Sequence, residues 1–119
     1  MKKTLDILNG LANENRFRLF LALLARDACV CELQAILDIE QSRLSHQLRT
    51  LKFFGLVEAR QDGRWIVYSV PEKVKKNPIV QAIEKNSELP LAVKGKIHRV
   101  KIWGVQRDKK LEKKKRKEK

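Results

Sequence analysis

Several kinds of pattern are missing from this 119-residue sequence, and each absence excludes a class of protein. No apolar run approaches the roughly 18 residues that a membrane-spanning helix needs. The sequence has no glycine-rich phosphate loop, no paired carboxylates around a histidine and no nucleophile motif, so we expect no enzymatic activity. The N-terminus reaches Asp6 and Asn9-Gly10 where a signal peptide would have its apolar core. We therefore expect a cytoplasmic protein without a membrane partner.

Cysteine is scarce, and the only two cysteines, Cys29 and Cys31, are separated by one residue. Two thiols this close in sequence cannot cross-link distant parts of a fold, which excludes a disulfide framework. A thiol-disulfide catalyst would have the spacing Cys-x-x-Cys instead. In a reducing compartment such a pair favours metal binding or redox chemistry. A structural role also stays open, because a buried cysteine often behaves as a small apolar side chain.

Acidic residues are in the minority, with 14 Asp and Glu against 27 Lys and Arg, a formal net charge of +13. This excess favours a polyanionic partner such as nucleic acid or an anionic membrane surface. Residues 105–119 carry nine Lys or Arg and three Asp or Glu, a net charge of +6. We expect that tail to be disordered in isolation. The rest of the chain is still basic.

Apolar residues recur at helical spacing through the first half of the chain. The pattern predicts a short helix that ends near residues 9–11, a helix capped by Asn13 whose apolar stripe reaches Leu24, and helices over 30–37 and 41–54. Gly55 is the expected C-cap of the last of these. About three residues separate the last two helices, which is the spacing of a helix-turn-helix.

After Gly55 the apolar period changes from 3.6 to 2. Residues 56–61 and 64–70 are predicted strands joined by Asp62-Gly63, a strong hairpin signal. Further helices are expected over 78–86, capped by Asn77, and over 91–103. The predicted fold class is mainly α with a β-hairpin wing (α+β), a winged helix-turn-helix. The predicted divisions are a winged helix-turn-helix domain over 1–86, an extension over 87–104 and a basic tail over 105–119.

The helix over 41–54 has two different faces. At about 100° per residue, Leu44, Leu48 and Leu51 point to the core, whereas small hydroxyls, an imidazole and a guanidinium point outward. The order of the elements favours a DNA-reading face over a merely solvated one. The predicted DNA contacts are Gln41, Ser42, Arg43, Ser45, His46, Arg49 and Lys52 on the helix, with Arg60 and Arg64 on the wing. Gln47 is expected beside the phosphates as well.

Five segments in register closely resemble the ArsR/SmtB family of metalloregulatory repressors: residues 12–19, 29–33, 41–52, 55–57 and 62–69. The resemblance covers residues 3–85 or so. It implies a homodimer that binds an inverted-repeat operator in double-stranded DNA, represses transcription and leaves the operator when a ligand binds. It also implies a dimer interface made by the first and last helices of the domain. The positions that contact the operator in the family correspond to Gln41, Ser42, Ser45 and His46.

Arsenic sensors of that family carry Cys-Val-Cys followed by an acid, Leu and Cys, and this sequence has Cys29, Cys31 and then Gln34 at the third cysteine position. The resemblance implies a soft ion such as arsenite or antimonite as inducer at Cys29 and Cys31, with no obligatory cofactor. Residues i and i+2 lie on nearly opposite sides of a helix, so chelation would distort the first turn of helix 30–37. Redox or persulfide sensing through the same thiols and a ligand-independent DNA-binding accessory protein remain as alternatives.

Overall fold

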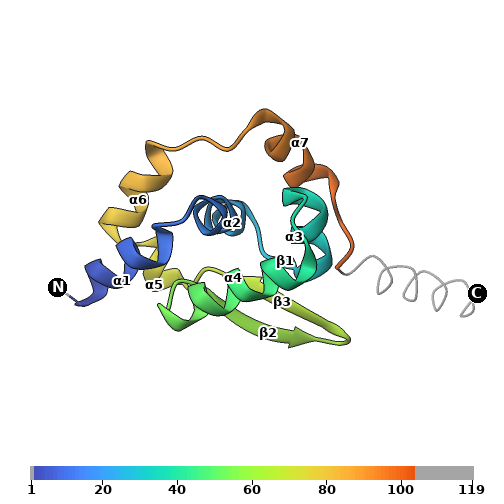
Figure 1. Cartoon of the computed structure of the whole chain (residues 1–119), viewed down its shortest axis with the longest axis horizontal. Coiled ribbons are helices and arrows are strands. Elements are labelled where there is room, and N and C mark those ends of the chain that lie inside the picture. Colours follow the sequence, from blue (N-terminus) through green and yellow to red (C-terminus); the bar gives the residue numbers. More distant parts are fainter. Residues whose placement is uncertain (1, 104–119) are drawn as a thin grey trace, which may run out of the picture.

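Residues 2–103, which the computed structural model describes, form a helical body with a small sheet at one edge (Figure 1). The elements in chain order are α1 (Lys2–Leu11), α2 (Glu14–Ala25), β1 (Ala28–Cys29), α3 (Val30–Leu37), α4 (Gln41–Phe53), β2 (Glu58–Asp62), β3 (Trp65–Ser69), α5 (Glu72–Lys75), α6 (Pro78–Lys85) and α7 (Leu91–Arg99). The predicted fold class, mainly α with a β-hairpin wing, is confirmed. Over the same residues, every helix is too short or too polar to cross a bilayer.

Helix α2 is the centre of the core, and Figure 1 shows it end-on with the other helices around it. Asn13 caps it as predicted, because its side chain accepts a hydrogen bond from the amide of Arg16 at 3.1 Å. The apolar residues of α2 join the inward leucines of α4 in one buried cluster that includes Leu19, Phe20, Leu23, Leu44, Leu48 and Leu51. Each fully buried leucine stabilises the fold by about 1.5–3 kcal/mol. The core therefore fixes the rotation of α4.

A residue in the left-handed region follows the C-terminus of both α3 and α4. Asp38 ends α3 at a φ of 54°, and it is the first of the three residues that lead into α4. Gly55 ends α4 at a φ of 74°, and the amides of Gly55 and Leu56 bond the carbonyls of Lys52 and Leu51 at 3.0 Å each. This is a Schellman arrangement, which favours glycine because a Cβ would be strained at positive φ. Gly55 closes α4 as predicted, but it stands one position after the C-cap residue, which is Phe54.

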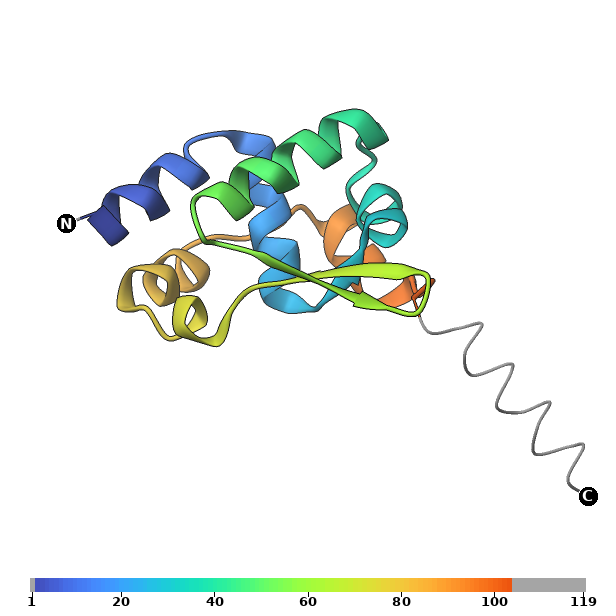
Figure 2. The same cartoon turned by 90° about the horizontal axis from the view of Figure 1, so that it is seen from below.

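The sheet has three antiparallel strands in the order β1-β3-β2. The hairpin of β2 and β3 projects from the helical body (Figure 2). The predicted turn was wrong by one residue: Asp62 pairs with Trp65, so the two loop residues are Gly63 and Arg64. Gly63 has a φ of 62° at the first loop position, a conformation that glycine adopts without strain. Strand β1 was not predicted, because two residues have no detectable period.

Residues 70–103, the described part of the chain after the wing, contain three helices. Helix α5 was not predicted, and α6 begins as expected with the Asn77 side chain accepting from the amide of Ile79 at 2.9 Å. Helix α7 ends at Arg99, which is shorter than the predicted helix over 91–103. Ile97 of α7 packs with Ala22 and Ile36 in a second small core. Residues 87–103 therefore contribute to packing, whereas the predicted basic tail over 105–119 lies outside the described residues.

Candidate nucleic-acid interface and thiol segment

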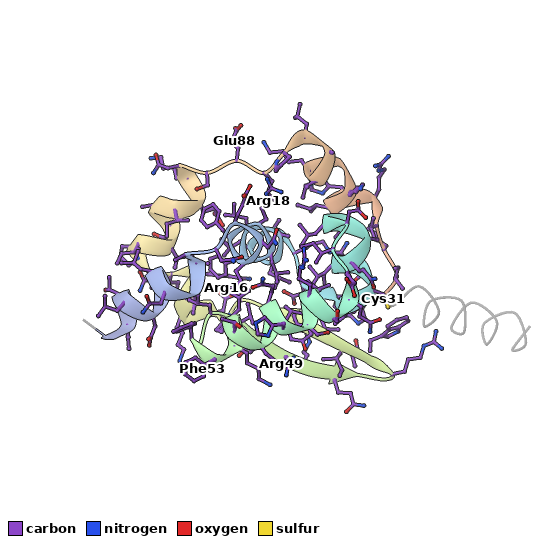
Figure 3. All side chains as sticks on the ribbon, in the orientation of Figure 1. Arg16, Arg18, Cys31, Arg49, Phe53 and Glu88 are labelled. Carbon is purple, nitrogen blue, oxygen red and sulfur yellow. The ribbon has the colours of Figure 1, made fainter. Side chains whose placement is uncertain are left out.

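The outward face of α4, which we call the reading face, is defined by Gln41, Ser42, Arg43, Ser45, His46, Arg49 and Lys52. Six of these side chains are exposed, and Ser45 is half-buried. Within residues 2–103, the side chains of Arg43, His46, Arg49 and Lys52 make no hydrogen bond or ion pair. In Figure 3, Arg49 points away from the body. The reading face therefore presents cationic and imidazole donors that are free to bind a ligand.

Gln47 does not belong to this face, and the prediction that it lies beside phosphates was wrong. It is only 7% exposed, and its Oε1 accepts from Arg16 Nη1 at 3.4 Å. Arg16 also donates to the carbonyl oxygens of Gly10 at 2.8 Å and Asn9 at 3.2 Å. Gln47 therefore ties α4 to the end of α1. The sequence held the signal, because position 47 is three residues after Leu44 and four before Leu51 on the inward stripe.

The two wing arginines, predicted to act together, have different surroundings. Arg64 lies in the exposed turn, with its Cζ 4.8 Å from the centre of the Trp65 ring. Arg60 Nη2 donates to Asp27 Oδ2 at 3.1 Å, and its Cζ lies 5.4 Å from the centre of the Trp103 ring. Arg60 therefore connects the wing to the end of α2 and to the C-terminal segment. Arg64 is the arginine that the wing presents at its tip.

The two cysteines share one short segment but not one environment. Cys29 is 2% exposed, pairs with Val67 in the sheet and occupies the N-cap position of α3. Burial raises the pKa of the Cys29 thiol, so this thiol stays protonated at neutral pH. Cys31 is exposed in the first turn of α3. Over the described part of the chain, no group of three or more His, Cys, Asp or Glu side chains is arranged to hold a metal ion.

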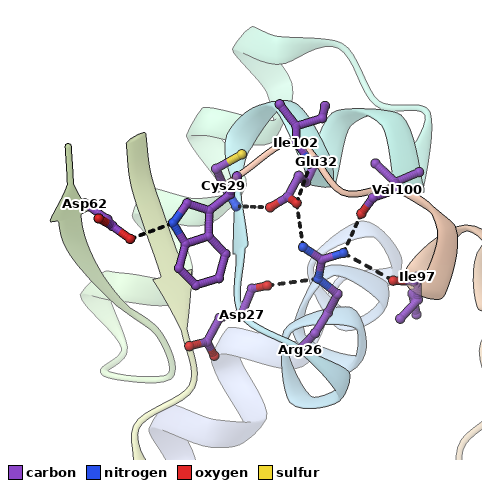
Figure 4. Close-up of polar contacts among 9 residues, drawn as sticks. Arg26, Asp27, Cys29, Glu32, Asp62, Ile97, Val100 and Ile102 are labelled. Carbon is purple, nitrogen blue, oxygen red and sulfur yellow. Dashed lines mark hydrogen bonds and ion pairs between the residues drawn. The ribbon is translucent and has the colours of Figure 1, made fainter. Parts of the chain in front are cut away.

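Glu32 is fully buried and lies at the centre of a polar network beside Cys29 (Figure 4). Its Oε1 accepts from the amide of Cys29 at 3.0 Å. Its Oε2 accepts from Arg26 Nη2 at 2.6 Å and from the amide of Ile102 at 2.9 Å. Burial by itself would raise the pKa of Glu32, but these hydrogen bonds and the Arg26 charge outweigh it and lower that pKa. The start of α3 is thus held by an ionised carboxylate.

The residues of this network were missed in the sequence. Arg26 also donates to the carbonyl oxygens of Val100 and Ile97, and Trp103 Nε1 donates to Asp62 Oδ2 at 2.8 Å. Glu32 stands three residues after the N-cap, as in a capping box, but its N-cap residue is a cysteine where the usual signal has Ser or Thr. Arg26 and Glu32 are six residues apart, and the contacts that join them to Ile97, Val100 and Ile102 span 70 residues or more. Asp62 and Trp103 are 41 residues apart, and no local pattern connects any of these pairs.

Known proteins share this arrangement of helices and wing. The family model described as bacterial regulatory protein, arsR family, matches residues 13–59, from the N-cap of α2 into β2. The solved structure of reduced HlyU from Vibrio cholerae is 30% identical with a TM-score of 0.62, covering 70% of this chain and 86% of that one. The chain belongs to the arsR family. This family consists of regulatory proteins, which agrees with the expectation that the chain is not an enzyme.

Two further relatives of this arsR-family chain are described as a repressor and as a DNA-binding domain. A putative arsenical resistance operon repressor of Halobacterium salinarum is 37% identical over 70 residues, 57% of this chain and 54% of that protein. The match thus spans about half the length of that relative. A homodimeric winged helix-turn-helix DNA-binding domain from Mycobacterium bovis is 26% identical with a TM-score of 0.61, covering 70% of this chain and 79% of that one. The fold of this chain is accordingly the winged helix-turn-helix.

Proposed function

We propose that the protein is a sequence-specific, DNA-binding transcriptional repressor. The observation that carries this proposal is the reading face of α4, whose free donors lie on a helix that Leu44, Leu48 and Leu51 fix against the core. A rigid helix with an adjacent wing is the geometry that places side chains in a major groove. The arsR family membership and the repressor name of the Halobacterium relative support the same function.

Each residue of the interface has a proposed role. His46 and Arg49 would hydrogen-bond base edges, and the small Ser42 and Ser45 would let the α4 backbone approach the groove. Gln41, Arg43 and Lys52 would contact phosphates at its margins, and Arg64 would reach the flanking minor groove or backbone. Arg60 was predicted as a DNA contact, and we now assign it to support of the wing because its guanidinium binds Asp27.

The protein is proposed to act as a homodimer through α1 and α6. Leu5 and Leu8 of α1 are 53% and 50% exposed, which is unusual for neighbouring leucines of one small domain. An apolar groove continues from Leu8 between α1, α2 and α6, lined by Phe17, Ile79 and Ile83. The Mycobacterium relative is described as homodimeric. A twofold dimer would read an inverted-repeat operator, because its two reading faces are related by the same symmetry.

The proposed inducer is a thiol-seeking ion, with arsenite or antimonite favoured by the name of the Halobacterium relative. Cys29 belongs to both the sheet and the cap of α3, so it cannot join Cys31 around one ion while it stays buried. Its release would break the pairing with Val67 and the bond to Glu32. Because α3 positions α4, this change would move the reading face. The ion must favour the released state by about 1–3 kcal/mol.

A second candidate is a repressor that responds to oxidants or persulfides. Cys31 is exposed and Cys29 is buried, an arrangement that allows chemistry at one thiol without chelation by two. The resemblance to HlyU, solved in a reduced form and named a transcriptional activator in Vibrio cholerae, favours this candidate more than the arsenical relative does. In both candidates the DNA-binding surface is the same. A ligand-independent accessory protein would share that surface but lack any inducer.

Selection from a random duplex pool tests DNA binding, and titration of the selected complex tests the inducer. We expect enrichment of an inverted repeat that binds about 10³-fold or more tightly than random duplex. Equal binding to all duplexes would support the accessory protein instead. Arsenite, antimonite, cadmium and peroxide are then added to complexes of the wild type, Cys29→Ser and Cys31→Ser. Arsenite release that needs both thiols supports chelation, and peroxide release that needs only Cys31 supports the second candidate.

A further inference from the structure

The last described residues, 100–103, form a strap that leads from the end of α7 to the wing. Its main chain is bound by Arg26 and Glu32, the charged pair of the network beside Cys29 (Figure 4). Arg26 donates to the carbonyl oxygen of Val100, and Glu32 Oε2 accepts from the amide of Ile102 at 2.9 Å. The strap is therefore anchored to the interior of the domain next to the thiol segment.

The end of the strap lies against the wing. Trp103 Nε1 donates to Asp62 Oδ2 at 2.8 Å. The Arg60 Cζ lies 5.4 Å from the centre of the Trp103 ring, within the range of a cation–π interaction. Asp62 is the last residue of β2, directly before the turn that carries Arg64. Trp103 thus contacts the wing close to its tip.

The outer end of the wing lies beyond the third strand of the sheet. Strand β1 pairs with β3 at Val67 and Tyr68, whereas Trp65 at the outer end of β3 pairs with Asp62 of β2. A two-stranded hairpin is marginally stable by itself in water. Trp103 binds the wing at Asp62, in its two-stranded part, so this contact fixes the position of the tip relative to the body.

The wing is also joined to Cys29 across the sheet. Cys29 of β1 pairs with Val67 of β3, and Val67 pairs with Arg60 of β2, so the three residues form one row. The amide of Cys29 donates to Glu32 Oε1 at 3.0 Å, and the other oxygen of the same carboxylate binds the strap. The contacts therefore close a ring that runs from Cys29 through the wing and the strap to Glu32 and back.

Release of Cys29 would open this ring at two points together, the pairing with Val67 and the bond to Glu32. Glu32 stands in the first turn of α3, so a change at the start of this helix displaces the carboxylate that binds Ile102. The coupling must act in both directions with the same factor, because two linked equilibria affect each other equally. A loosened strap would therefore make the release of Cys29 easier.

We propose that the strap couples the wing to the thiol segment. Trp103 is a positioning residue that holds the hairpin in its DNA-binding position while Cys29 is buried, and the hairpin is freed when Cys29 is released. This inference rests on the proposed DNA-binding function and extends its regulation from α4 to the wing. An inducer at the thiols then weakens two DNA contacts, the reading face through α3 and the Arg64 contact through the strap.

The first test measures the coupling without DNA or inducer. N-ethylmaleimide is added to the Cys31→Ser protein, in which Cys29 is the remaining thiol, and mass spectrometry gives the rate of modification. Because a buried thiol reacts when the structure around it opens, this rate reports the population of the released state. We expect Trp103→Ala to raise the rate about tenfold. Trp103→Phe keeps an aromatic ring without the donor and should raise the rate less.

Val80→Ala is the matched control for the alkylation test. It truncates a buried residue of α6 and so lowers the stability of the fold away from the strap. Urea denaturation compares its stability with that of Trp103→Ala. The rate at Cys29 should not change in Val80→Ala, because local opening at the thiol segment does not involve α6. An unchanged rate in Trp103→Ala, or an equal increase in Val80→Ala, would overturn the proposal.

The second test asks whether Trp103 affects DNA binding through the tip of the wing. Arg64→Ala, Trp103→Ala and the double variant are titrated with the selected operator. We expect each single variant to bind about tenfold more weakly, and Trp103→Ala to have little further effect once Arg64 is replaced. Equal losses in the two backgrounds would show that Trp103 does not position Arg64, which contradicts the proposal.

The two tests distinguish failure of this inference from failure of the proposed function. If the wild type selects no operator from the duplex pool, the proposed function fails whatever the alkylation rates are. If an operator is selected but the rate at Cys29 does not depend on Trp103, the proposed function stands and the coupling is wrong.

Discussion

The reading face of α4 and the thiol segment at the start of α3 belong to consecutive helices, yet their polar groups are satisfied in opposite ways. The cationic and imidazole side chains of the reading face have no partner among residues 2–103. At the start of α3, Glu32 is fully buried and accepts three hydrogen bonds. The difference indicates that the surface proposed to bind DNA is formed in advance, whereas the proposed sensor must open before both thiols can act.

The largest expected effect breaks the reading face and leaves the thiol segment intact. His46→Ala with Arg49→Ala should weaken operator binding by about 1–3 kcal/mol for each lost base contact. The unfolding free energy should stay within about 0.5 kcal/mol of the wild type, because both side chains are exposed. Fluorescence anisotropy with the operator and urea denaturation measure the two quantities. Arg18→Ala on α2 is the matched control, and an equal loss of affinity there would contradict the assignment (Figure 3).

A substitution in the buried network around Glu32 should mainly lower the free energy of unfolding. Glu32→Gln removes the buried charge that faces Arg26, and it should lower the free energy of unfolding by about 3 kcal/mol because the partly buried guanidinium then lacks its charged partner. Urea denaturation measures the loss. Glu72→Gln, which removes an exposed partner of Lys75, should cost less than about 1 kcal/mol. Similar losses in the two variants would mean that the Glu32 network does not stabilise the start of α3.

The contribution of Glu32 to stability should depend on pH. The pKa of Glu32 is lowered by folding, so its charge stabilises the native state above the ordinary value of 4.5 and this contribution is lost as pH falls below that value. The stability gap between wild type and Glu32→Gln should therefore be full near neutral pH and should shrink below pH 4.5. Denaturation at a series of pH values measures the gap. A gap that grows in acid would contradict the lowered pKa.

The smallest effect concerns the two thiols. An alkylating reagent should modify Cys31 at least about tenfold faster than Cys29, because Cys29 is buried and its thiol pKa is raised. Mass spectrometry of Cys29→Ser and Cys31→Ser gives the separate rates, and denatured protein provides the reference in which the rates converge. Glu32→Gln should narrow the native ratio, since it loosens the cap around Cys29. Equal native rates in the wild type would show that the segment is already open.

The sequence predicted the parts of the fold that local periodicity describes. The inward leucines of α4, the caps at Asn13 and Asn77 and the end of α4 at Gly55 follow from residues within one or two helical turns. Gln47 could have been assigned to the core by the same periodicity, since it shares the stripe of Leu44 and Leu51. The hairpin turn was misplaced by one residue because Asp-Gly fits two adjacent positions of a tight turn.

The roles of Arg60 and Glu32 could not be predicted in this way. Arg60 was predicted to contact DNA, and the structure places its guanidinium beside Asp27 and Trp103, which lie 33 and 43 residues away in sequence. In the sequence, the positive charge of Arg60 indicates a DNA contact. Its support of the wing can be inferred only from its tertiary contacts. Glu32 has the appearance of a surface residue in the sequence, because a carboxylate is rarely fully buried without partners.

By itself the sequence determined where α3 and α4 lie, the N-caps of α2 and α6, which side of α4 is apolar, the basic balance of charge and the spacing of the two thiols. These are properties of neighbouring residues, and the physical rules that produce them act over a few positions. The tertiary structure alone decided that Cys29 is buried and Cys31 is not, that Arg26 and Glu32 bind the main chain of Val100 and Ile102, and that Trp103 contacts the wing. Those contacts join residues up to 74 apart, which only the packing of the whole core brings together.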